Sequence, residues 1–260
     1  MVSGRGFADL WDGLLSEGRV TTTQAEIRDR TGSSVGSVRV AVAEAQRRHF
    51  LFSPVRGLYV LVPPQYRSQG TVPADWYLDD LCRHLHRDYY LGYLSAAARH
   101  GSAHQAPQVT QTMVDRTVAD RTLGPVRLRF YTDRRMSEWP VAPVTGPTGS
   151  LRVATPETCA FDLAQAPERG GGVGNVVTVL RGLTLDTEAL ARQAPRRPRA
   201  TVRRLGFLLE HTDTVGGLDA LAKIAIADYN RTPLDPTGPH DGPVDRRWHV
   251  VLNTTVEPDE

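Results

Sequence analysis

Hydrophobic and polar positions in residues 1–62 follow two different periods. Near the N-terminus, apolar residues recur at the spacing of an amphipathic helix: Phe7, Leu10, Trp11, Leu14 and Leu15. Farther on, two short apolar runs at 51–52 and 58–62 flank a turn-forming segment that contains Gly57. The pattern predicts helices followed by a β-hairpin.

A pair of short helices is predicted between these segments. Thr23 and Glu26 form a Thr-x-x-Glu capping box, which marks the start of a helix. Gly32 can adopt the left-handed conformation that ends it, and Ser33 or Ser34 can cap the next helix. That helix carries one apolar stripe: Val38, Ala41, Val42 and Ala45. Two helices across so short a turn, followed by a hairpin, predict a winged helix-turn-helix.

The opposite face of the second helix has the composition of a DNA-contacting surface. It is small and polar near its start and basic near its end: Ser37, Arg39, Val40, Ala43, Arg47 and Arg48. Small residues allow close approach to base edges, Arg39 can donate two hydrogen bonds to guanine, and later arginines can bind phosphate. The candidate DNA-binding residues, which include the hairpin tip, are Ser33, Ser34, Ser37, Arg39, Arg47, Arg48 and Arg56.

Helix pairs of this kind also occur as plain packing units and in winged domains that bind only protein. Charge favours DNA here. Between Ser34 and Tyr66 there are four arginines against one acid, Glu44, whereas the whole chain carries a formal charge of only +2.

Composition places the chain among ordinary globular proteins. It has 260 residues, 40% hydrophobic and 23% charged, enough for one large domain or two modest ones. No apolar run approaches the length of a membrane span, and no signal-peptide core follows Met1, so we expect a cytoplasmic protein without membrane contact. Cys82 and Cys159 are expected to be free reduced thiols.

A domain boundary is expected near Ser68, because Pro63 and Pro64 end the hairpin and a polar stretch follows. The predicted fold class is α+β, with a winged helix-turn-helix at 1–67 and a larger mixed α/β domain at 68–260. In the second domain the periodicity predicts strands at 109–114, 126–131, 151–154 and 248–253, and helices at 76–85, 90–98, 156–164, 175–183, 187–193, 200–211 and 218–229.

Residues with metal-binding chemistry do not cluster in the sequence. Cys82, His84 and His86 lie two apart, so a helix would place His84 on a different face from the other two, and no second ligand cluster accompanies them. The glycines at 170–174 have no following Gly-Lys-Ser/Thr and predict a flexible loop. We expect no metal site and no cofactor.

Three acids mark the alternative of an enzyme. Asp133, Glu157 and Asp162 lie at or after predicted strands, where a metal-dependent nuclease places its carboxylates. No Glu-x-Lys motif follows, and helix capping explains Glu157 more simply, since Thr155 and Pro156 precede it. The expectation is therefore a chain without catalytic residues.

A second basic segment lies in the C-terminal half. No acid occurs between Ala189 and Leu209, and an apolar set ends the segment. The pattern predicts a basic surface on a partly buried helix. It is either a solvated face or a second contact with the DNA backbone, or with an acidic or RNA-bound partner. The candidate residues are Arg196, Arg197, Arg199, Arg203 and Arg204.

Several segments together resemble the AbiEi antitoxins of type IV toxin–antitoxin systems. They are RGLYV at 56–60, YLSAAARHG at 93–101, ATPET at 154–158, FDL at 161–163, RLGFLLE at 204–210 and WHVVLN at 248–253. Order and spacing carry the resemblance, which covers most of the chain. The glycine-rich segment at 170–174 and the proline-rich loop near 240 are not features of that family.

The resemblance implies a two-part, non-catalytic protein. The winged helix would repress its own operon at inverted repeats in double-stranded DNA. The C-terminal domain would counteract a cognate nucleotidyltransferase toxin, directly or indirectly. Two alternatives stay open on sequence grounds: a nuclease-like enzyme guided by the winged helix, and a one-component transcription regulator that senses a small molecule.

Overall fold

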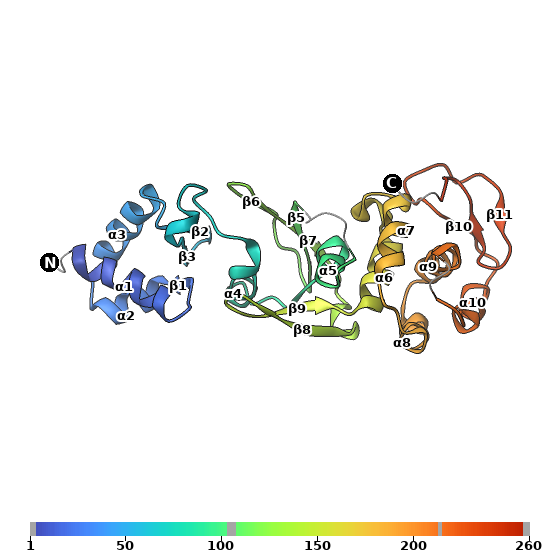
Figure 1. Ribbon diagram of the computed structural model, residues 1–260, viewed down its shortest axis with the longest axis horizontal. Helices are drawn as coiled ribbons and strands as arrows, with labels where there is room; N and C mark the ends of the chain where they lie inside the picture. Colours follow the sequence, from blue (N-terminus) through green and yellow to red (C-terminus); the bar gives the residue numbers. More distant parts are fainter. Residues whose placement is uncertain (1–3, 103–107, 213–214, 257–260) are drawn as a thin grey trace. The chain divides into compact units, whose positions relative to one another are not determined.

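The computed structural model describes residues 4–102, 108–212 and 215–256. The chain forms two compact units. The first comprises Met1–Tyr89, Gln108–Met136 and Pro143–Arg152, and the second comprises Tyr90–Pro107, Ser137–Ala142 and Val153–Glu260. Each unit therefore draws on several segments of the sequence (Figure 1).

The N-terminal part has helices followed by a hairpin, as the periodicity predicts. Its helices are α1 (Gly4–Ser16), α2 (Gln24–Thr31) and α3 (Val35–Arg47). Strands β2 (Leu51–Val55) and β3 (Leu58–Leu61) pair antiparallel. A third strand, β1 (Thr21–Thr23), pairs antiparallel with β3 and was not predicted, because three polar threonines carry no apolar alternation.

Local signals determine the ends of α2 and α3. The Thr23 hydroxyl accepts a hydrogen bond from the Glu26 backbone N–H at 3.2 Å, so the predicted cap is confirmed. Gly32 ends α2 with φ 62°, in the left-handed region that suits glycine. Ser34, rather than Ser33, caps α3. The three helices and the hairpin share one core: Phe7, Trp11, Leu14, Ile27, Val38, Val42, Ala45, Leu51 and Leu61.

The hairpin also packs against later residues of the first unit, which include α4 (Leu78–His84). The rings of Phe52 and Tyr77 meet edge to face with centroids 5.4 Å apart. The Arg121 Nε donates to the Pro54 carbonyl at 3.1 Å. These contacts tie residues on either side of Ser68 into one packed body.

A six-stranded mixed sheet runs in the order β6-β7-β5-β4-β9-β8. Strands β5 and β7 are parallel, as are β4 and β9, whereas β6 and β7 are antiparallel. In β7 the buried Leu128 and Phe130 alternate with the exposed Arg127 and Arg129, so the predicted half-buried strand is confirmed. The bounds are β4 Tyr89–Leu91, β5 Val109–Val114, β6 Arg121–Leu123, β7 Val126–Thr132, β8 Val141–Gly146 and β9 Gly149–Ala154.

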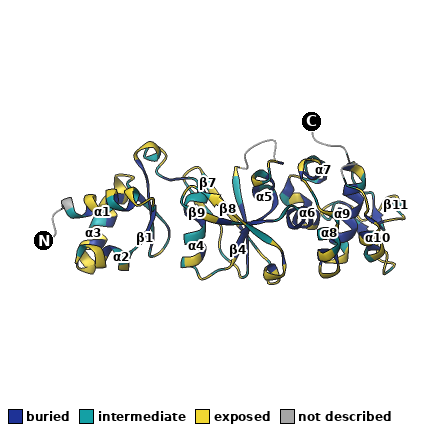
Figure 2. Cartoon of the chain, turned by 60° about the horizontal axis from the view of Figure 1, so that its bottom comes forward, coloured by how far each residue is buried: buried dark blue, intermediate teal, exposed yellow. Residues whose placement is uncertain are grey.

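Helices make up most of the second unit. They are α5 (Tyr93–Arg99), α6 (Pro156–Gln165), α7 (Val173–Gly182), α8 (Thr187–Gln193), α9 (Arg199–Thr212) and α10 (Asp219–Ala225). Helix α9 is largely enclosed, since residues 201–209 are all buried (Figure 2). A small sheet, β10-β12-β11, follows; its strands are Thr232–Pro233, Val244–Asp245 and Val250–Val251.

Four sequence predictions need correction. The helix expected at 90–98 begins at Tyr93, because Tyr89–Leu91 form strand β4 instead. The strand expected at 248–253 is confined to Val250–Val251, and the helix expected at 218–229 ends at Ala225. The glycines at 170–174 do not form a loose loop: a Cβ on Gly170 would lie 2.7 Å from Val176 and 2.8 Å from Leu163. Close packing between a short 3₁₀ turn and α7 explains this glycine. No helix in the described ranges is both long and apolar enough to cross a bilayer.

Candidate nucleic-acid interface

Helix α3 has one buried and one exposed face. Val38, Val42 and Ala45 lie in the core. The candidate contact residues face outward, and all are exposed: Ser37, Arg39, Val40, Ala43, Arg47 and Arg48 (Figure 2). The apolar stripe is used entirely for packing, so the opposite side of the helix is left accessible.

The start of α3 presents two hydroxyl groups. The Ser34 Oγ accepts from the Ser37 backbone N–H at 3.2 Å and lies 3.0 Å from the Ser37 Oγ. Both residues are exposed. Ser33 is different: it is buried, and its hydroxyl points away from solvent. Its inclusion among the candidate contact residues is therefore corrected, because a buried side chain cannot reach a DNA groove.

The end of α3 is strongly basic. The Arg48 guanidinium carbon lies 4.5 Å from the centroid of the Phe50 ring, and that of Arg67 lies 4.2 Å from the same centroid. Such cation–π contacts hold both guanidinium groups near one ring. Arg67 was not among the predicted contact residues. The signal that could have found it is a basic residue in the polar segment directly after the hairpin.

The hairpin tip presents Arg56. Gly57 has φ 86°, a conformation that glycine adopts without strain, and the Ser53 hydroxyl donates to the Val55 carbonyl at 2.7 Å. The Arg56 carbonyl oxygen lies 3.1 Å from the His84 Nε2. The backbone of the tip is thus held, while the Arg56 side chain is exposed.

The arginines of this surface are not neutralised by the protein. Within residues 4–102, 108–212 and 215–256, no ion pair involves Arg39, Arg47, Arg48 or Arg56. By contrast, Arg19 and Arg30 of the α1–α2 region pair with Glu26 and Glu17. Four unpaired cations on and beside one helix face produce a positive potential that attracts a polyanion.

The predicted second basic surface is wrong for three of its five arginines. Arg197 is 5% exposed. Its Nη1 donates to the Asp162 carboxylate at 3.1 Å and its Nη2 to the Gln193 side chain at 3.1 Å. Its guanidinium carbon lies 3.8 Å from the centroid of the Trp139 ring. Arg197 is a core residue and cannot bind a phosphate.

Arg203 and Arg204 are also buried, at 2% and 7% exposure. Arg203 donates to the Ala225 carbonyl at 2.9 Å and pairs with Asp228. Arg204 donates to the carbonyls of Pro233 and Ala164 at 2.9 and 3.1 Å. Only Arg196 and Arg199 of the five are exposed, and Arg199 pairs with Asp228. The three buried arginines of this segment donate hydrogen bonds to acceptors inside the second unit, so its basic sequence does not form a basic surface.

The acids of the enzyme alternative serve structural roles. Asp162 is buried and accepts hydrogen bonds from Tyr90 and Arg197. Glu157 is buried and accepts from the Asp186 backbone N–H at 3.0 Å. Asp133 accepts from the Arg135 backbone N–H at 2.8 Å. In the part of the chain that the structure describes, no three His, Cys, Asp or Glu side chains are placed to share a metal ion.

Both cysteines are free and buried, which confirms the expectation of unpaired thiols. Burial raises the pKa of the Cys82 thiol to about 12, and burial also raises the pKa of Cys159 well above its ordinary value. Burial thus disfavours the thiolate form of both side chains.

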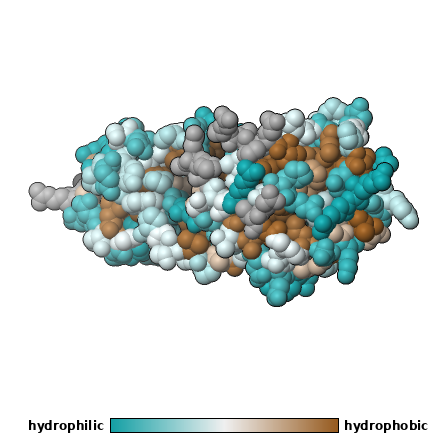
Figure 3. All heavy atoms as spheres, turned by 45° about the vertical axis from the view of Figure 1, so that its right-hand side comes forward, coloured by the Kyte–Doolittle hydropathy of each residue, from teal (hydrophilic) through white to brown (hydrophobic). Residues whose placement is uncertain are grey.

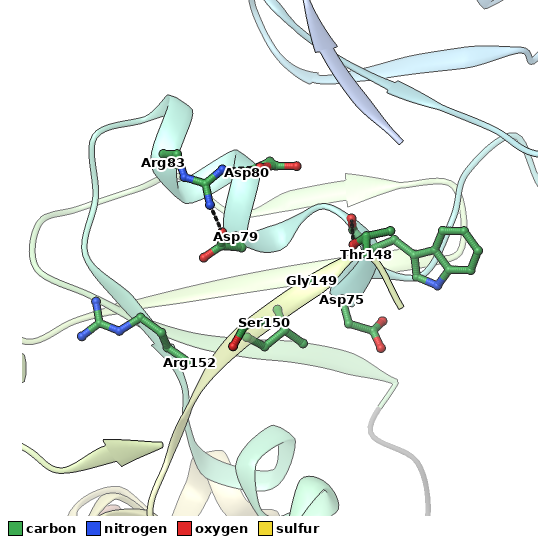
Figure 4. Close-up of a pocket in the computed structure, with 10 residues that line it drawn as sticks. Asp75, Asp79, Asp80, Arg83, Thr148, Gly149, Ser150 and Arg152 are labelled. Carbon is green, nitrogen blue, oxygen red and sulfur yellow. Dashed lines mark hydrogen bonds and ion pairs between the residues drawn. The ribbon is translucent and has the colours of Figure 1, made fainter. Parts of the chain in front are cut away.

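A polar pocket lies on the first unit between the start of α4 and strand β9 (Figure 4). Arg83 points between Asp79 and Asp80 and pairs with both. Asp75, Ser150 and Arg152 lie on the other sides of the pocket. Two of the acids that line the pocket thus share one cationic partner, Arg83.

Comparisons with known proteins fit this fold. Residues 90–211 match the family model described as the AbiEi antitoxin C-terminal domain. Among solved structures, the chain is similar to the RV2827C protein from Mycobacterium tuberculosis, with a TM-score of 0.65 and 18% sequence identity. The match covers 94% of this chain and 89% of that one. No curated protein sequence matches the chain.

Proposed function

We propose that this chain is the DNA-binding antitoxin of a type IV toxin–antitoxin operon, because residues 90–211 match the family model of the AbiEi antitoxin C-terminal domain. In this proposal residues 1–67 act as a winged helix-turn-helix that represses the operon at inverted repeats. The second part counteracts a cognate nucleotidyltransferase toxin, directly or indirectly. No step requires catalysis by this chain.

The observation that carries the DNA-binding half is the exposed, unneutralised face of α3. In a helix-turn-helix the second helix enters the major groove, and its N-terminal residues contact base edges. Ser34, Ser37 and Arg39 occupy that end of α3 and are exposed. In the proposal, Arg47 and Arg48 at its other end bind phosphates, together with Arg56 at the hairpin tip.

The two kinds of contact predict different mutant phenotypes. Replacing Arg47 and Arg48 together by Ala is expected to weaken binding to every duplex and to reduce the slope of log K against log salt by about one for each lost phosphate contact. Arg39→Ala is expected to relax the preference at particular base pairs, with a cost of about 1–3 kcal/mol at those positions. Fluorescence anisotropy with the promoter of the operon, over a salt series, measures both.

Lys223→Ala is the matched control, since Lys223 is an exposed cation on α10 and its loss changes the net charge by the same amount as the loss of one arginine. It is expected to leave operator affinity unchanged. Operator affinity that survives both the Arg47/Arg48 and the Arg39 substitutions would show that α3 is not the DNA-contacting helix.

The antitoxin half is tested by co-expression with the neighbouring reading frame. Growth inhibition by that neighbour, relieved by the full chain, supports the proposal. The Arg39/Arg47/Arg48→Ala variant separates the two activities: it is expected to lose repression of a promoter reporter and to keep the rescue of growth. A harmless neighbour would remove the toxin-counteracting half of the proposal.

A further inference from the structure

We propose that Val40 contacts the C5-methyl group of a thymine in the operator and so selects one base of each half-site. This inference rests on the proposed DNA-binding function and adds to it the chemical feature that α3 selects. The relevant observation is an apolar side chain at the centre of a face that is otherwise small, polar or basic.

Val40 is 67% exposed, although valine is a residue that proteins usually bury. It lies opposite the core stripe of α3. Gly36, Val40, Ala43 and Arg47 follow one another at helical spacing, so they share the line of the helix farthest from Val38 and Val42. A helix that enters a groove along this line presents Val40 first.

The residues on either side of Val40 add no bulk. A Cβ placed on Gly36 would meet only the Ser34 Oγ, at 3.8 Å, so no contact within the protein requires glycine there. Glycine nevertheless costs a helix about 1 kcal/mol relative to alanine. The small side chains of Gly36 and Ala43 leave the Val40 methyl groups as the most prominent apolar atoms of this line.

Charge favours a polyanion such as duplex DNA as the occupant of this face. Arg39 directly precedes Val40, and Arg47 lies two turns farther along the same line of the helix. Glu44, one turn from Val40, is the one acid on α3. This face would be a poor docking site for a basic protein or for an apolar peptide. An isopropyl group has no hydrogen-bonding atoms, and the apolar feature that the major groove displays is the methyl group of thymine. Contact between the two buries apolar surface and excludes water.

The experiment removes that methyl group alone. Each thymine of the operator is replaced in turn by deoxyuridine, which keeps base pairing and lacks only the C5-methyl group. At one position in each half-site the wild-type chain is expected to bind about fourfold more weakly, the factor that corresponds to one buried methyl group. Val40→Ala is expected to bind the unmodified operator more weakly and to show no further loss at that position, as a double-mutant cycle requires for a direct contact.

Val35→Ala is the matched control, because Val35 is also exposed and lies on α3, but five residues away and on a different line of the helix. The Val35→Ala variant is expected to show the same fourfold loss of affinity as the wild-type chain when deoxyuridine replaces the thymine that Val40 contacts. Gly36→Ala is expected to bind the operator more weakly while its thermal stability is equal or higher, since the added methyl group obstructs only the approach of DNA.

The outcomes distinguish this inference from the function it rests on. Tight wild-type binding that is insensitive to deoxyuridine at every position overturns the thymine contact and leaves DNA binding intact. The thymine contact is also overturned if the Val40→Ala variant loses as much affinity on deoxyuridine substitution as the wild-type chain does. A wild-type chain that fails to bind its promoter at all overturns the DNA-binding proposal, and the Val40 contact with it.

Discussion

Arg197 lies between an aromatic ring and a carboxylate, where its charge is compensated within the fold. Its guanidinium group stacks on Trp139 and donates to Asp162, which is 3% exposed. Burial of an unpaired charge costs much more than burial of a pair. The role of an arginine in this chain is therefore determined by the acceptors around it, as the contrast with the unpaired Arg39 and Arg47 shows.

Arg197→Met is expected to destabilise the protein by about 3–5 kcal/mol, because the substitution leaves the Asp162 carboxylate buried without its cation. Urea unfolding followed by tryptophan fluorescence measures the loss. Arg39→Ala is the control: Arg39 is exposed and makes no ion pair within the described ranges, so we expect a change within about 0.5 kcal/mol. Equal losses for the two variants would contradict the structural role of Arg197.

Glu26 predicts a pH effect in the first unit. Its hydrogen bond with Arg19, aided by Thr22 and Arg30, holds the pKa of the carboxyl group below its ordinary value of 4.5. A lowered folded-state pKa stabilises the protein above pH 4.5, and this contribution is lost as the pH falls through the lowered pKa.

Glu26→Gln is therefore expected to lower stability at pH 7 by about 1 kcal/mol or less, and the difference from wild type should shrink below pH 4.5. Melting temperatures of the variant and the wild type between pH 7 and pH 3 show whether the difference in stability shrinks in acid, as expected. Glu44→Gln is the control, since Glu44 makes no ion pair within the described ranges. A Glu26→Gln deficit that grows in acid would contradict the assignment.

At the scale of elements, α9 and the C-terminal segment depend on one close contact. A Cβ on Gly206 would lie 1.9 Å from the Trp248 ring, which is fully buried and whose Nε1 donates to Glu210 at 2.6 Å. A rigid indole held by a hydrogen bond cannot move aside easily. Gly206 is therefore the space into which Trp248 fits, and the pair joins α9 to the segment that includes β12.

Gly206→Ala is expected to destabilise the second unit by about 1–3 kcal/mol, the usual cost of overpacking a core. Gly216→Ala is the matched control: a Cβ there meets no atom within 4 Å. The comparison is a thermal melt of both variants. Equal melting temperatures would show that Trp248 has room to shift.

The hydrophobic surface also differs between elements. Figure 3 shows brown, hydrophobic residues interspersed with teal ones over the C-terminal helices on its right-hand side. Among the large apolar side chains of the described ranges, those exposed are Val35, Val40, Ile226 and Tyr229. Two of the four lie on α3, and one of these, Val40, lies on the line that also carries Arg47.

At the scale of the whole molecule, the hairpin depends on residues beyond the expected boundary at Ser68. Phe52 packs on Tyr77, Pro54 accepts from Arg121, and the Arg56 carbonyl meets His84, all within the first unit. The helices α1–α3, in contrast, pack on their own core. A fragment of residues 1–67 would therefore keep the core of α1–α3 but lose the contacts that support its hairpin.

A fragment of residues 1–67 is therefore expected to melt at a lower temperature than the same segment in the full chain. Amide hydrogen exchange measures this by segment: protection should fall most in β2 and β3 and least in α3. Full protection of the hairpin in the fragment would show that 1–67 is an autonomous domain and that the later contacts contribute little.

The sequence by itself was sufficient for features that depend on neighbours in the chain. The caps at Thr23 and Ser34, the left-handed turn at Gly32 and the two faces of α3 follow from hydrogen bonds and side-chain spacing within a few residues. The resemblance to the antitoxin family also came from local segments, and the match of residues 90–211 to the family model confirms that resemblance.

Tertiary structure alone decided which arginines are exposed on the surface and which are paired in the interior. Arg197 pairs with Asp162, 35 positions away, and Arg203 reaches Asp228, 25 positions away. Strand β1 likewise forms only because β3 supplies its hydrogen-bonding partners. Periodicity describes which side of an element is apolar, but a buried charge or a polar strand is stabilised by partners that are distant in sequence, and only the folded chain brings them together.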